Sequence, residues 1–406
     1  MASFPKNKIR VLLLENIHHQ ALRLFEEETF QVDVLHGALE EDELRQKIQD
    51  IHILGIRSKT QVTANVLEQA AKLLGIGVFC IGTNQLDLPA CALKGIPVFN
   101  APYSNTRSVV EMALGEMIML IRKVFVKSAQ LHQGIWDKSA RNSFEVRGKT
   151  LGIVGYGNIG SQLSVLAEAL GMQVVFYDVV DKLALGNARK CESLEELLRV
   201  SDAVSLHVDG RPENHHLIGR TQFEMMKPSA VFLNLSRGHV VDIDALRDAL
   251  LQHKIHGASV DVFPEEPVNN AQKFESALCG LPNAILTPHV GGSTEEAQYS
   301  IGEFVARKLI YFVNKGDTYG AVNFPEVQLP AFVQSHRMLH VHDNVPGILA
   351  QINTILANYS ANIQSQYLKT QQDIGYVITD IASDYHPEML QALKAIPQTI
   401  RLRVLY

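Results

Sequence analysis

The stretch KTLGIVGYGNIG, residues 149–160, joins a short apolar run to a glycine-rich turn. The apolar run before Gly155 is typical of a buried strand, and the residues that follow as far as Leu170 have the periodicity of a helix. In such a unit Gly155 permits a tight turn, Gly157 lets backbone N–H groups approach a pyrophosphate, and Gly160 lets the helix pack against the sheet. The stretch therefore predicts a dinucleotide-binding βαβ unit, although glycine-rich turns also occur for packing alone.

A second apolar run, residues 172–177, ends at Asp178. A carboxylate at this strand end can accept hydrogen bonds from the ribose diol of an adenosine, whereas its charge would repel the 2′-phosphate of NADP. The strand, the helix and the terminal acid together favour NAD as the cofactor.

The chain has 406 residues, of which 46% are hydrophobic, and a formal net charge of −6. Because this length exceeds one ordinary core, we expect two or three domains. The negative charge gives no general attraction for nucleic acid or an anionic membrane, and no apolar segment is long enough to cross a bilayer. We therefore expect neither a nucleic-acid nor a membrane partner.

The four cysteines are widely spaced and form no CxxC pair. This usage is typical of free thiols in a reduced compartment, so we expect a cytoplasmic protein. The chain also has 16 histidines. The pairs at positions 18 and 19, 215 and 216, and 340 and 342 lack a carboxylate or cysteine at ligand spacing, so we expect no metal site.

The distribution of apolar runs predicts an α/β protein with two doubly wound parallel sheets. Four runs alternate with helical patterns before residue 100, and six more follow Lys149. Between the two sets, the pattern from Ser108 to Gln133 predicts one long helix, with Val124 on its apolar face. The expected strands are residues 9–14, 51–56, 74–78 and 98–100 in the first sheet, and 151–154, 174–177, 203–208, 231–235, 258–262 and 284–286 in the second.

A smaller third domain is expected at the C-terminal end. After a helical pattern from Glu295 to Val313, residues 318–334 have the composition of a linker. The remaining residues, from Arg337 to Leu405, alternate in the order βαββαβ, which predicts a ferredoxin-like unit suited to pairing or ligand sensing. The expected domains are residues 1–107 with 297–330, residues 108–296, and residues 335–406.

Polar residues follow three strands of the second sheet at their carboxyl ends, where ligands bind in open parallel sheets. Arg237 follows the fourth strand, Glu265 and Glu266 follow the fifth, and His289 follows the sixth. An imidazole that takes a hydroxyl proton, a carboxylate that holds its ring and a guanidinium that binds a substrate carboxylate suit hydride transfer from a secondary alcohol. Singly, each is as compatible with a surface residue, and the spacing does not choose between the two glutamates.

The motifs GYGNIG, NLSRG, DVFPEEP and TPHVGG resemble those of the D-isomer-specific 2-hydroxyacid dehydrogenase family, over residues 8 to 325. The resemblance implies a substrate domain, a Rossmann NAD domain and three catalytic residues. Arg237 would bind the substrate carboxylate, Glu266 would pair with the base, and His289 would accept the proton. The expected cofactor-binding residues are Gly155, Gly157, Asn158, Ile159, Gly160, Asp178, Ser236, Arg237, Asp261, His289, Gly291 and Gly292.

Three further segments, GIRSKT, CIGTNQLDL and FNAPYSNTRSVVE, resemble the members of this family that act on 3-phosphoglycerate and carry a regulatory ACT domain. The implied reaction oxidises the C2 hydroxyl to give 3-phosphohydroxypyruvate and passes the hydride to NAD, the first step of serine synthesis. For Arg57 the alternative is a surface salt bridge, and many relatives have arginine at Lys59. The expected substrate-binding residues are Arg57, Ser58, Lys59, Asn105, Arg107 and Arg237, while Trp136 and Lys138 resemble a segment that reaches a neighbouring subunit.

The C-terminal segments HVHDNVPG and ANIQSQYL resemble the ACT signature. The resemblance implies a homotetramer with paired ACT domains, in which His342, Asn344 and Asn362 bind L-serine as an inhibitor. Alternatively, His342 only lies on a polar strand face and Asn344 caps a helix that begins near Pro346. The linker at residues 332–336 is one residue longer than in close relatives.

Two other functions fit parts of this pattern. One is a hydroxypyruvate or glyoxylate reductase, which would lack the ACT domain and would not need Arg57 and Lys59. The other is a non-catalytic NAD-sensing protein that resembles the C-terminal-binding corepressors. The amino-acid-sensing tail favours a metabolic enzyme, and the sequence leaves open whether 2-oxoglutarate is also reduced.

Overall fold

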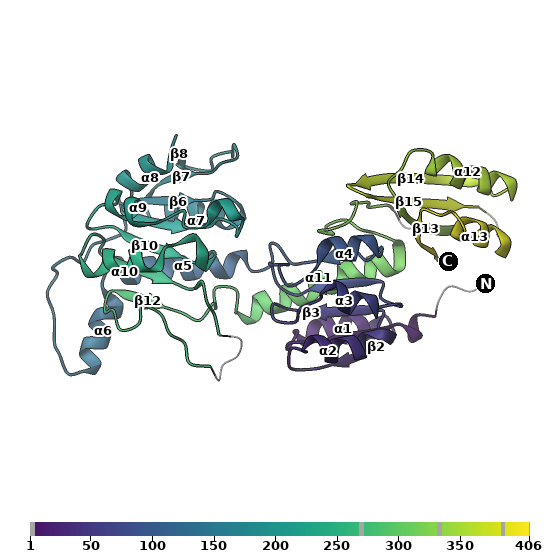
Figure 1. Cartoon of the computed structure of the whole chain (residues 1–406). Helices are drawn as coiled ribbons and strands as arrows, with labels where there is room; N and C mark the ends of the chain where they lie inside the picture. The colour runs from purple at the N-terminus through teal and green to yellow at the C-terminus, as the bar shows by residue number, and fades with distance from the viewer. Residues whose placement is uncertain (1–4, 268–271, 331–334, 383–385, 406) are drawn as a thin grey trace. The chain divides into compact units, whose positions relative to one another are not determined.

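The computed structural model describes residues 5–267, 272–330, 335–382 and 386–405. The chain forms two compact units; unit 1 contains two sheets and unit 2 contains one (Figure 1). Unit 1 comprises Met1–Ser104 and Gln298–Tyr406, and unit 2 comprises Asn105–Ala297. The C-terminal domain expected at residues 335–406 therefore belongs to the same unit as the N-terminal sheet.

Unit 1 contains a parallel sheet of five strands in the order β2-β1-β3-β4-β5. The sequence predicted four of them and missed β2, because its residues are largely exposed and form no apolar run. The strands are β1 (Arg10–Leu13), β2 (Gln31–Val34), β3 (Ile53–Ile56), β4 (Gly75–Val78) and β5 (Val98–Phe99).

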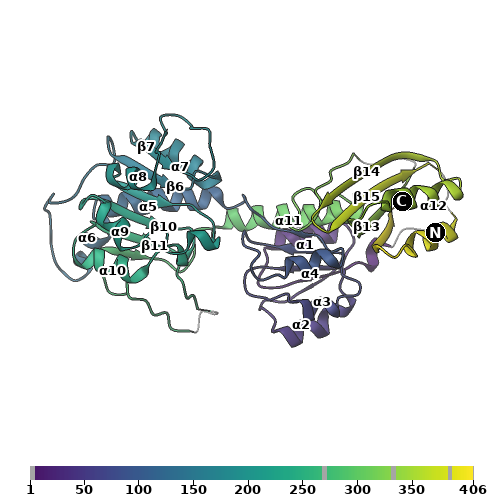
Figure 2. The same ribbon diagram turned by 45° about the horizontal axis from the view of Figure 1, so that its top comes forward.

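Helices cover both faces of this sheet, as the doubly wound class requires. Apolar residues of α1 and α11 form one core, and those of α2, α3 and α4 form the other. Helices α1 and α11 lie side by side in Figure 2. The helices are α1 (His19–Glu27), α2 (Glu41–Lys47), α3 (Ala64–Glu68), α4 (Leu88–Leu93) and α11 (Glu295–Lys315), with short 3₁₀ turns η1 (Lys6–Lys8) and η2 (Ile48–Asp50).

Unit 2 contains a parallel sheet of seven strands in the order β12-β11-β10-β9-β6-β7-β8. Six were predicted, and the seventh, β8, is a two-residue exposed edge strand that leaves no apolar signal. The strands are β6 (Thr150–Val154), β7 (Gln173–Tyr177), β8 (Arg189–Lys190), β9 (Ala203–Leu206), β10 (Val231–Asn234), β11 (Gly257–Val260) and β12 (Ala284–Leu286).

The prediction of one long helix between the sheets is wrong in one respect, because the helix is broken at Lys123. This residue adopts φ +56°, outside the helical region, and Val124 is 48% exposed instead of buried. The first part, α5, packs with α7 on one face of the sheet, and α8, α9 and α10 cover the other. The helices are α5 (Thr106–Ile121), α6 (Val124–His132), α7 (Asn158–Ala169), α8 (Leu194–Val200), α9 (Arg220–Met225) and α10 (Ile243–Leu251), with 3₁₀ turns η3 (Pro212–Asn214) and η4 (Gly238–Val240).

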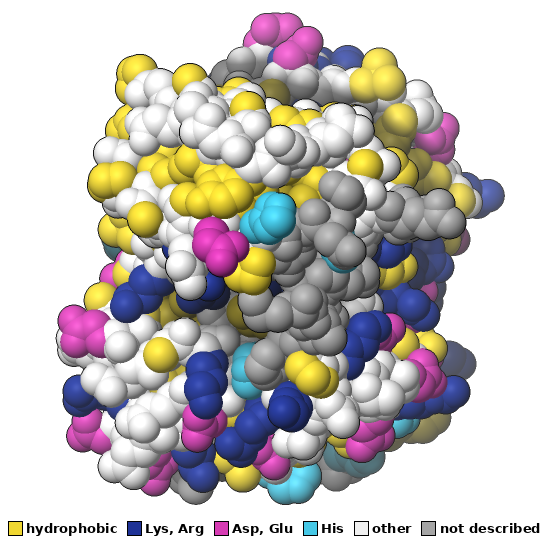
Figure 3. Space-filling model, turned by 90° about the vertical axis from the view of Figure 1, so that its right-hand side faces the viewer, with side chains coloured by type: hydrophobic (Ala, Val, Ile, Leu, Met, Phe, Trp, Pro, Cys, Tyr) yellow, Lys and Arg dark blue, Asp and Glu magenta, His cyan; other side chains and the backbone are white. Residues whose placement is uncertain are grey.

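The C-terminal part of unit 1 has the predicted βαββαβ order. Its antiparallel sheet has the strand order β14-β15-β13-β16, which is ferredoxin-like. Figure 3 views the molecule from the side of this sheet and shows hydrophobic side chains gathered on the upper part of that face. The elements are β13 (His336–Asp343), α12 (Ile348–Asn358), β14 (Ile363–Gln371), β15 (Ile374–Ile381), α13 (Pro387–Lys394) and β16 (Thr399–Leu405).

The C-terminal sheet is covered on both faces. Apolar residues of α12 and α13 pack on one face, while Leu339, Val341 and Tyr376 on the other join the core of the N-terminal sheet. Arg337, 1% exposed, makes two hydrogen bonds of 2.7 and 2.8 Å to Asp380, and it also donates to the carbonyl of Lys315 at the end of α11. These contacts explain why the C-terminal domain belongs to unit 1.

Candidate active site

The glycine-rich turn has the geometry that its sequence predicts. Gly155 adopts φ +91°, and a Cβ there would lie 2.6 Å from the carbonyl oxygen of His207. A Cβ on Gly160 would lie 2.3 Å from the Gly155 oxygen, so only glycine lets α7 approach β6 this closely. At Gly157, which precedes the first residue of α7, a Cβ would meet nothing within 4 Å. The open space before this helix N-terminus fits a bound pyrophosphate.

Asp178 follows β7, beside the glycine-rich turn. Its two carboxylate oxygens accept hydrogen bonds from the backbone N–H groups of Tyr156, at 2.8 Å, and Val180, at 2.9 Å. Each oxygen keeps a further lone pair, so the carboxylate is fixed in place and can still accept hydrogen bonds from a ribose diol. The residues present therefore fit NAD at this end of the sheet.

The loops after β10 and β11 approach each other closely at Gly238. A Cβ on this glycine would lie 1.9 Å from the backbone carbon of Phe263, so no larger residue fits there. Arg237, which precedes it, is half-buried and donates from Nη1 to the Ser236 carbonyl at 2.7 Å. Ser236 is fixed in turn by Asn234, whose side-chain oxygen accepts from its N–H and its hydroxyl. Arg237 was predicted from the sequence, whereas the close contact at Gly238 was not.

His289 and Glu266 lie in hydrogen-bond contact. The Nδ1 atom of His289 is 2.8 Å and 3.1 Å from the two carboxylate oxygens of Glu266, and the Phe263 N–H donates to the same carboxylate. The hydrogen bond that His289 donates to the Glu266 carboxylate raises the pKa of His289, against the effect of burial. For Glu266, burial acts to raise its pKa, but the hydrogen bonds from His289 and Phe263 and the charge of Arg237 give a net lowering. The geometry therefore selects Glu266, and not Glu265, as the partner of the imidazole.

The loop that carries His289 is held by Asp261. One carboxylate oxygen of this residue, which is 1% exposed, accepts from the Thr287 hydroxyl at 2.6 Å and the Val290 N–H at 2.9 Å, and the other accepts from the Gly291 N–H at 2.8 Å. The Asp261 carbonyl accepts from the N–H of His289, which adopts φ +55°. Asp261 was predicted to bind the cofactor, and its contacts within the chain position the His289 loop.

Asn105 and Arg107 lie at the start of α5. A Cβ on Gly292 would lie 2.4 Å from the Asn105 side-chain nitrogen, so a larger residue at position 292 would clash with this amide. Arg107 forms an exposed ion pair with Glu111 at 2.6 Å, one helical turn along α5. Their substrate role stays a prediction.

In unit 1, the residues after β3 form a turn that is fixed by Glu15. The buried Glu15 carboxylate accepts from the backbone N–H groups of Lys59, at 3.0 Å, and Thr60, at 2.8 Å. Within the described part of the chain no carboxylate pairs with Arg57, so the surface salt bridge considered as its alternative is not formed. Ser58 and Lys59 are exposed. The role of Glu15 has no signal in the sequence, because its partners are backbone groups 44 and 45 residues away.

The three expected effector residues differ in exposure. His342 is 1% exposed, its Nδ1 donates to the Asp343 carbonyl at 2.7 Å, and its Nε2 has no hydrogen-bond partner among the described residues. A Cβ on Gly375 would lie 2.2 Å from its ring. Asn344 is exposed and donates to the Gln372 carbonyl, so the alternative that it caps α12 is wrong, because Gly347 precedes that helix. Asn362 is exposed. The linker at residues 332–336 lies partly outside the described residues.

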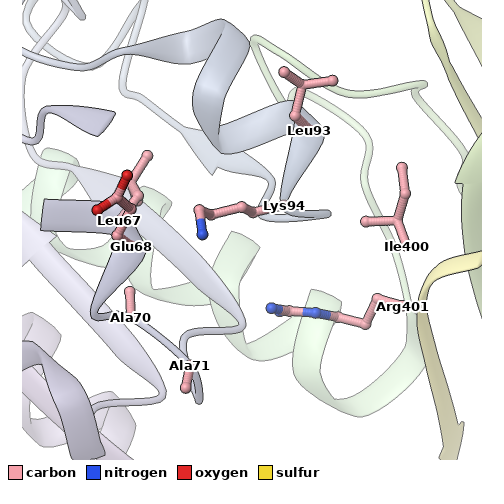
Figure 4. A pocket seen from close by; sticks show the side chains of 8 residues that line it. All are labelled: Leu67, Glu68, Ala70, Ala71, Leu93, Lys94, Ile400 and Arg401. Atoms are coloured by element: carbon pink, nitrogen blue, oxygen red, sulfur yellow. The ribbon is translucent and has the colours of Figure 1, made fainter. Parts of the chain in front are cut away.

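A pocket of about 390 Å³ in unit 1 contains none of the predicted site residues (Figure 4). It lies between the N-terminal sheet's helices and β16, with Lys94 and Arg401 as its cations and Glu68 as its carboxylate. The exposed segment 131–142 of unit 2 holds Trp136, which is 79% exposed, and Lys138. Among the described residues there is no group of three or more potential metal ligands, and no helix long and apolar enough to span a membrane.

Two family models match the chain. Residues 114–291 match the NAD binding domain of the D-isomer specific 2-hydroxyacid dehydrogenases, and residues 338–401 match an AHAS small subunit-like ACT domain. Full-length relatives decide the assignment. D-3-phosphoglycerate dehydrogenase of Escherichia coli K12 is 50% identical over 100% of this chain and 99% of its own length. The chain belongs to the D-isomer specific 2-hydroxyacid dehydrogenase family.

Other relatives agree with this assignment. D-3-phosphoglycerate dehydrogenase of Dictyostelium discoideum is 49% identical over 100% of this chain and 99% of its own length. Among solved structures, D-2-hydroxyisocaproate dehydrogenase is 26% identical, with a TM-score of 0.70 over 78% of this chain and 100% of its own. D-lactate dehydrogenase with NAD⁺ from Lactobacillus jensenii is 25% identical, with a TM-score of 0.66 over 75% of this chain and 96% of its own. NAD is the cofactor of this chain, which matches the NAD binding domain of the family.

Proposed function

We propose that this chain is an NAD-dependent D-3-phosphoglycerate dehydrogenase that oxidises the C2 hydroxyl of 3-phosphoglycerate to give 3-phosphohydroxypyruvate. The observation that carries the proposal is the contact of His289 Nδ1 with Glu266 beside Arg237, in a chain whose full-length relatives have this name. This is the first step of L-serine biosynthesis. The 50% identity over the whole chain, together with the ACT match, favours it over a hydroxypyruvate reductase or an NAD-sensing protein.

The proton chemistry follows from the hydrogen bond between His289 and Glu266. Because the lowered pKa of Glu266 keeps its carboxylate charged, Nδ1 of His289 must carry the hydrogen that joins them. The other ring nitrogen, Nε2, is then the basic atom of the neutral imidazole and takes the hydroxyl proton. Glu266 stabilises the imidazolium that forms, which the raised pKa of His289 reflects. Bound NAD supplies the hydride acceptor, C4 of its nicotinamide ring.

The remaining groups of the substrate are anionic. Arg237 binds the substrate carboxylate through its guanidinium, whose fork geometry matches two oxygens. The proposed candidates for binding the phosphate group are Arg57, Ser58 and Lys59 in unit 1, and Asn105 and Arg107 in unit 2. Arg57 is the stronger candidate of the two further arginines, because Arg107 is already paired with Glu111.

The C-terminal domain binds L-serine between two copies of the chain. His342 has an Nε2 atom without a hydrogen-bond partner among the described residues, while the exposed side chains of Asn344 and Asn362 offer amide donors and acceptors. The edge strand β14 exposes Ile363, Tyr367 and Leu368, which suits pairing with a second ACT domain. We further propose a cytoplasmic homotetramer in which Trp136 and Lys138 reach the neighbouring subunit.

Initial rates test this function. We expect kcat/KM for 3-phosphoglycerate to be at least about tenfold higher than kcat/KM for D-glycerate or D-2-hydroxyglutarate. We also expect L-serine to inhibit the reaction. A preference for glycerate would contradict the phosphate site. A chain that binds NADH but turns over none of the three substrates would support the NAD-sensing alternative instead.

A further inference from the structure

Helix α5 carries a buried carboxyl group for which the proposed reaction has no use. Glu116 is 3% exposed, and its Oε2 atom has no hydrogen-bond partner among the described residues. Burial raises its pKa to about 7; the nearby Ser259 hydroxyl acts to lower this pKa, and the charge of Asp261 acts to raise it further. A buried, titratable group of this kind needs a reason to be kept.

The packing of α5 on β11 places Glu116 above Ser259. Residues 112, 116 and 120 lie on one face of the helix, and residues 257, 259 and 261 lie on one face of the strand and its extension. At one end of this contact, a Cβ on Gly257 would lie 3.2 Å from Leu120. At the other end, a Cβ on Gly291 would lie 3.0 Å from Asp261 and 3.9 Å from Met112. Glu116 therefore lies between these points, next to Ser259 and Asp261.

Two carboxyl groups thus share one buried polar layer under the His289 loop. Asp261 has three donors for its carboxylate, whereas Glu116 has only a nearby hydroxyl, so the single negative charge belongs on Asp261. A second charge on Glu116 would repel it and weaken the hydrogen bonds that hold the loop.

Few other charged groups face this layer. Helix α7 contributes Leu163, Ser164 and Ala167, and β10 contributes Val231 and Leu233 to the same core. On α6, Lys127 is paired with Asp137, and His256 lies before the opposite end of β11, near Lys123. Among the described residues, the charge that acts on Glu116 is that of Asp261.

We propose that Glu116 is a positioning residue for hydride transfer, which in its neutral form leaves the buried charge to Asp261 and so keeps the His289 loop in place. This inference rests on the proposed role of His289. Glu116 acts through Ser259 and Asp261 and does not itself touch the reacting atoms. The loop is consequently held more firmly at neutral than at alkaline pH.

The test is the ratio of kcat/KM for 3-phosphoglycerate oxidation in Glu116→Gln to that in the unaltered enzyme, measured from pH 6 to 9. Glutamine keeps the shape and stays neutral, so we expect a ratio within about twofold of one at pH 6 that rises at least threefold by pH 8.5. The ratio cancels the titration of His289, which both proteins share. Glu224→Gln, an exposed glutamate of the same unit, is the matched control and should give a flat ratio.

Thermal unfolding of the same proteins gives a second readout that needs no activity. The midpoint difference between Glu116→Gln and the unaltered enzyme should grow over the same pH range. A flat kcat/KM ratio overturns the inference, whether or not the midpoints change, because a change in midpoints alone would make Glu116 structural. If His289→Ala retained full turnover, the proposed function of that residue would fail, while the midpoints would still report whether Glu116 titrates.

Discussion

The strand-end loops of unit 2 and the end of β13 in the C-terminal domain both present predicted ligand-binding residues, but only the first set is brought into contact within one chain. Arg237, Glu266 and His289 follow neighbouring strands of one sheet, and Glu266 contacts His289 directly. Asn344 and Asn362 are exposed on one copy of the C-terminal domain. A contact between loops of one sheet is visible in a single chain, whereas the serine site that we propose between two copies is not.

The two regions also use buried charge differently. In unit 2, Asp261 accepts hydrogen bonds from the loop that carries His289, so its charge positions a functional group. In the C-terminal domain, the bidentate pair of Arg337 and Asp380 holds β13 to β15, and Ser365 donates to the same carboxylate at 2.8 Å. Asp261 is expected to affect catalysis, and the Arg337–Asp380 pair is expected to affect stability.

The largest expected effect is that of His289→Ala. Loss of the base should lower kcat by about 10²–10⁴-fold. NADH affinity should change little, because the glycine-rich turn and Asp178 are untouched. Steady-state rates and NADH fluorescence titration measure the two quantities, with the exposed His253→Ala as control. An equal loss of kcat and NADH affinity would show that the imidazole is structural. Unit 2 would then not differ from the C-terminal domain in the way described above.

Arg337→Met should give the largest loss of stability. It leaves Asp380, whose side chain is 10% exposed, without its cation, and breaking a buried pair in this way costs about 3–5 kcal/mol. Urea unfolding followed by circular dichroism measures the change. The matched control, Arg23→Met, breaks an exposed pair with Glu27 that is worth about 0.3–0.5 kcal/mol. Similar losses for both variants would contradict the distinction between buried and surface charge.

Glu266→Gln should separate the role of the carboxylate from that of the imidazole. The hydrogen bond from His289 to the Glu266 carboxylate is the main cause of the raised pKa of His289, so loss of this bond to a charged acceptor lowers that pKa. Oxidation needs the neutral imidazole, so kcat/KM rises with pH through the His289 pKa, and in the variant this rise should move to lower pH. The plateau should fall about 10–100-fold, because the imidazolium is less stabilised. Glu265→Gln should leave the profile in place; a shift in that variant instead would reassign the partner.

The smallest effect on turnover is expected for Asn344→Ala. Activity without serine should stay within about twofold, because Asn344 is remote in sequence from the catalytic loops and exposed, while inhibition by L-serine should be lost. Rates at increasing serine concentration measure this, with Asn358→Ala at the end of α12 as control. Unchanged inhibition would remove Asn344 from the effector site.

The sequence predicted most of the strands, because buried strands leave a local pattern; it also placed Arg237, Glu266 and His289 at neighbouring strand ends. Buried strands leave apolar runs, and polar residues after parallel strands meet at one edge, as Glu266 and His289 do. The edge strands β2 and β8 were missed because exposed strands need no apolar residues. The break at Lys123 was missed because the apolar pattern continues across it.

Contacts between a residue and backbone that is distant in sequence could not be predicted either. Glu15 holds the Lys59 turn, and Gly238 admits the Phe263 backbone, yet neither contact has a periodic signal. The need for glycine at position 375 could not be predicted for the same reason, because it comes from the His342 ring that lies against Gly375.

The most direct test of the active site is a crystal structure of this enzyme with NADH and 3-phosphohydroxypyruvate. We predict that Nε2 of His289 lies about 3 Å from the C2 oxygen, with Nδ1 still on Glu266 and the Arg237 guanidinium on the substrate carboxylate. A bound substrate whose C2 oxygen contacts neither His289 nor Arg237 would contradict the account.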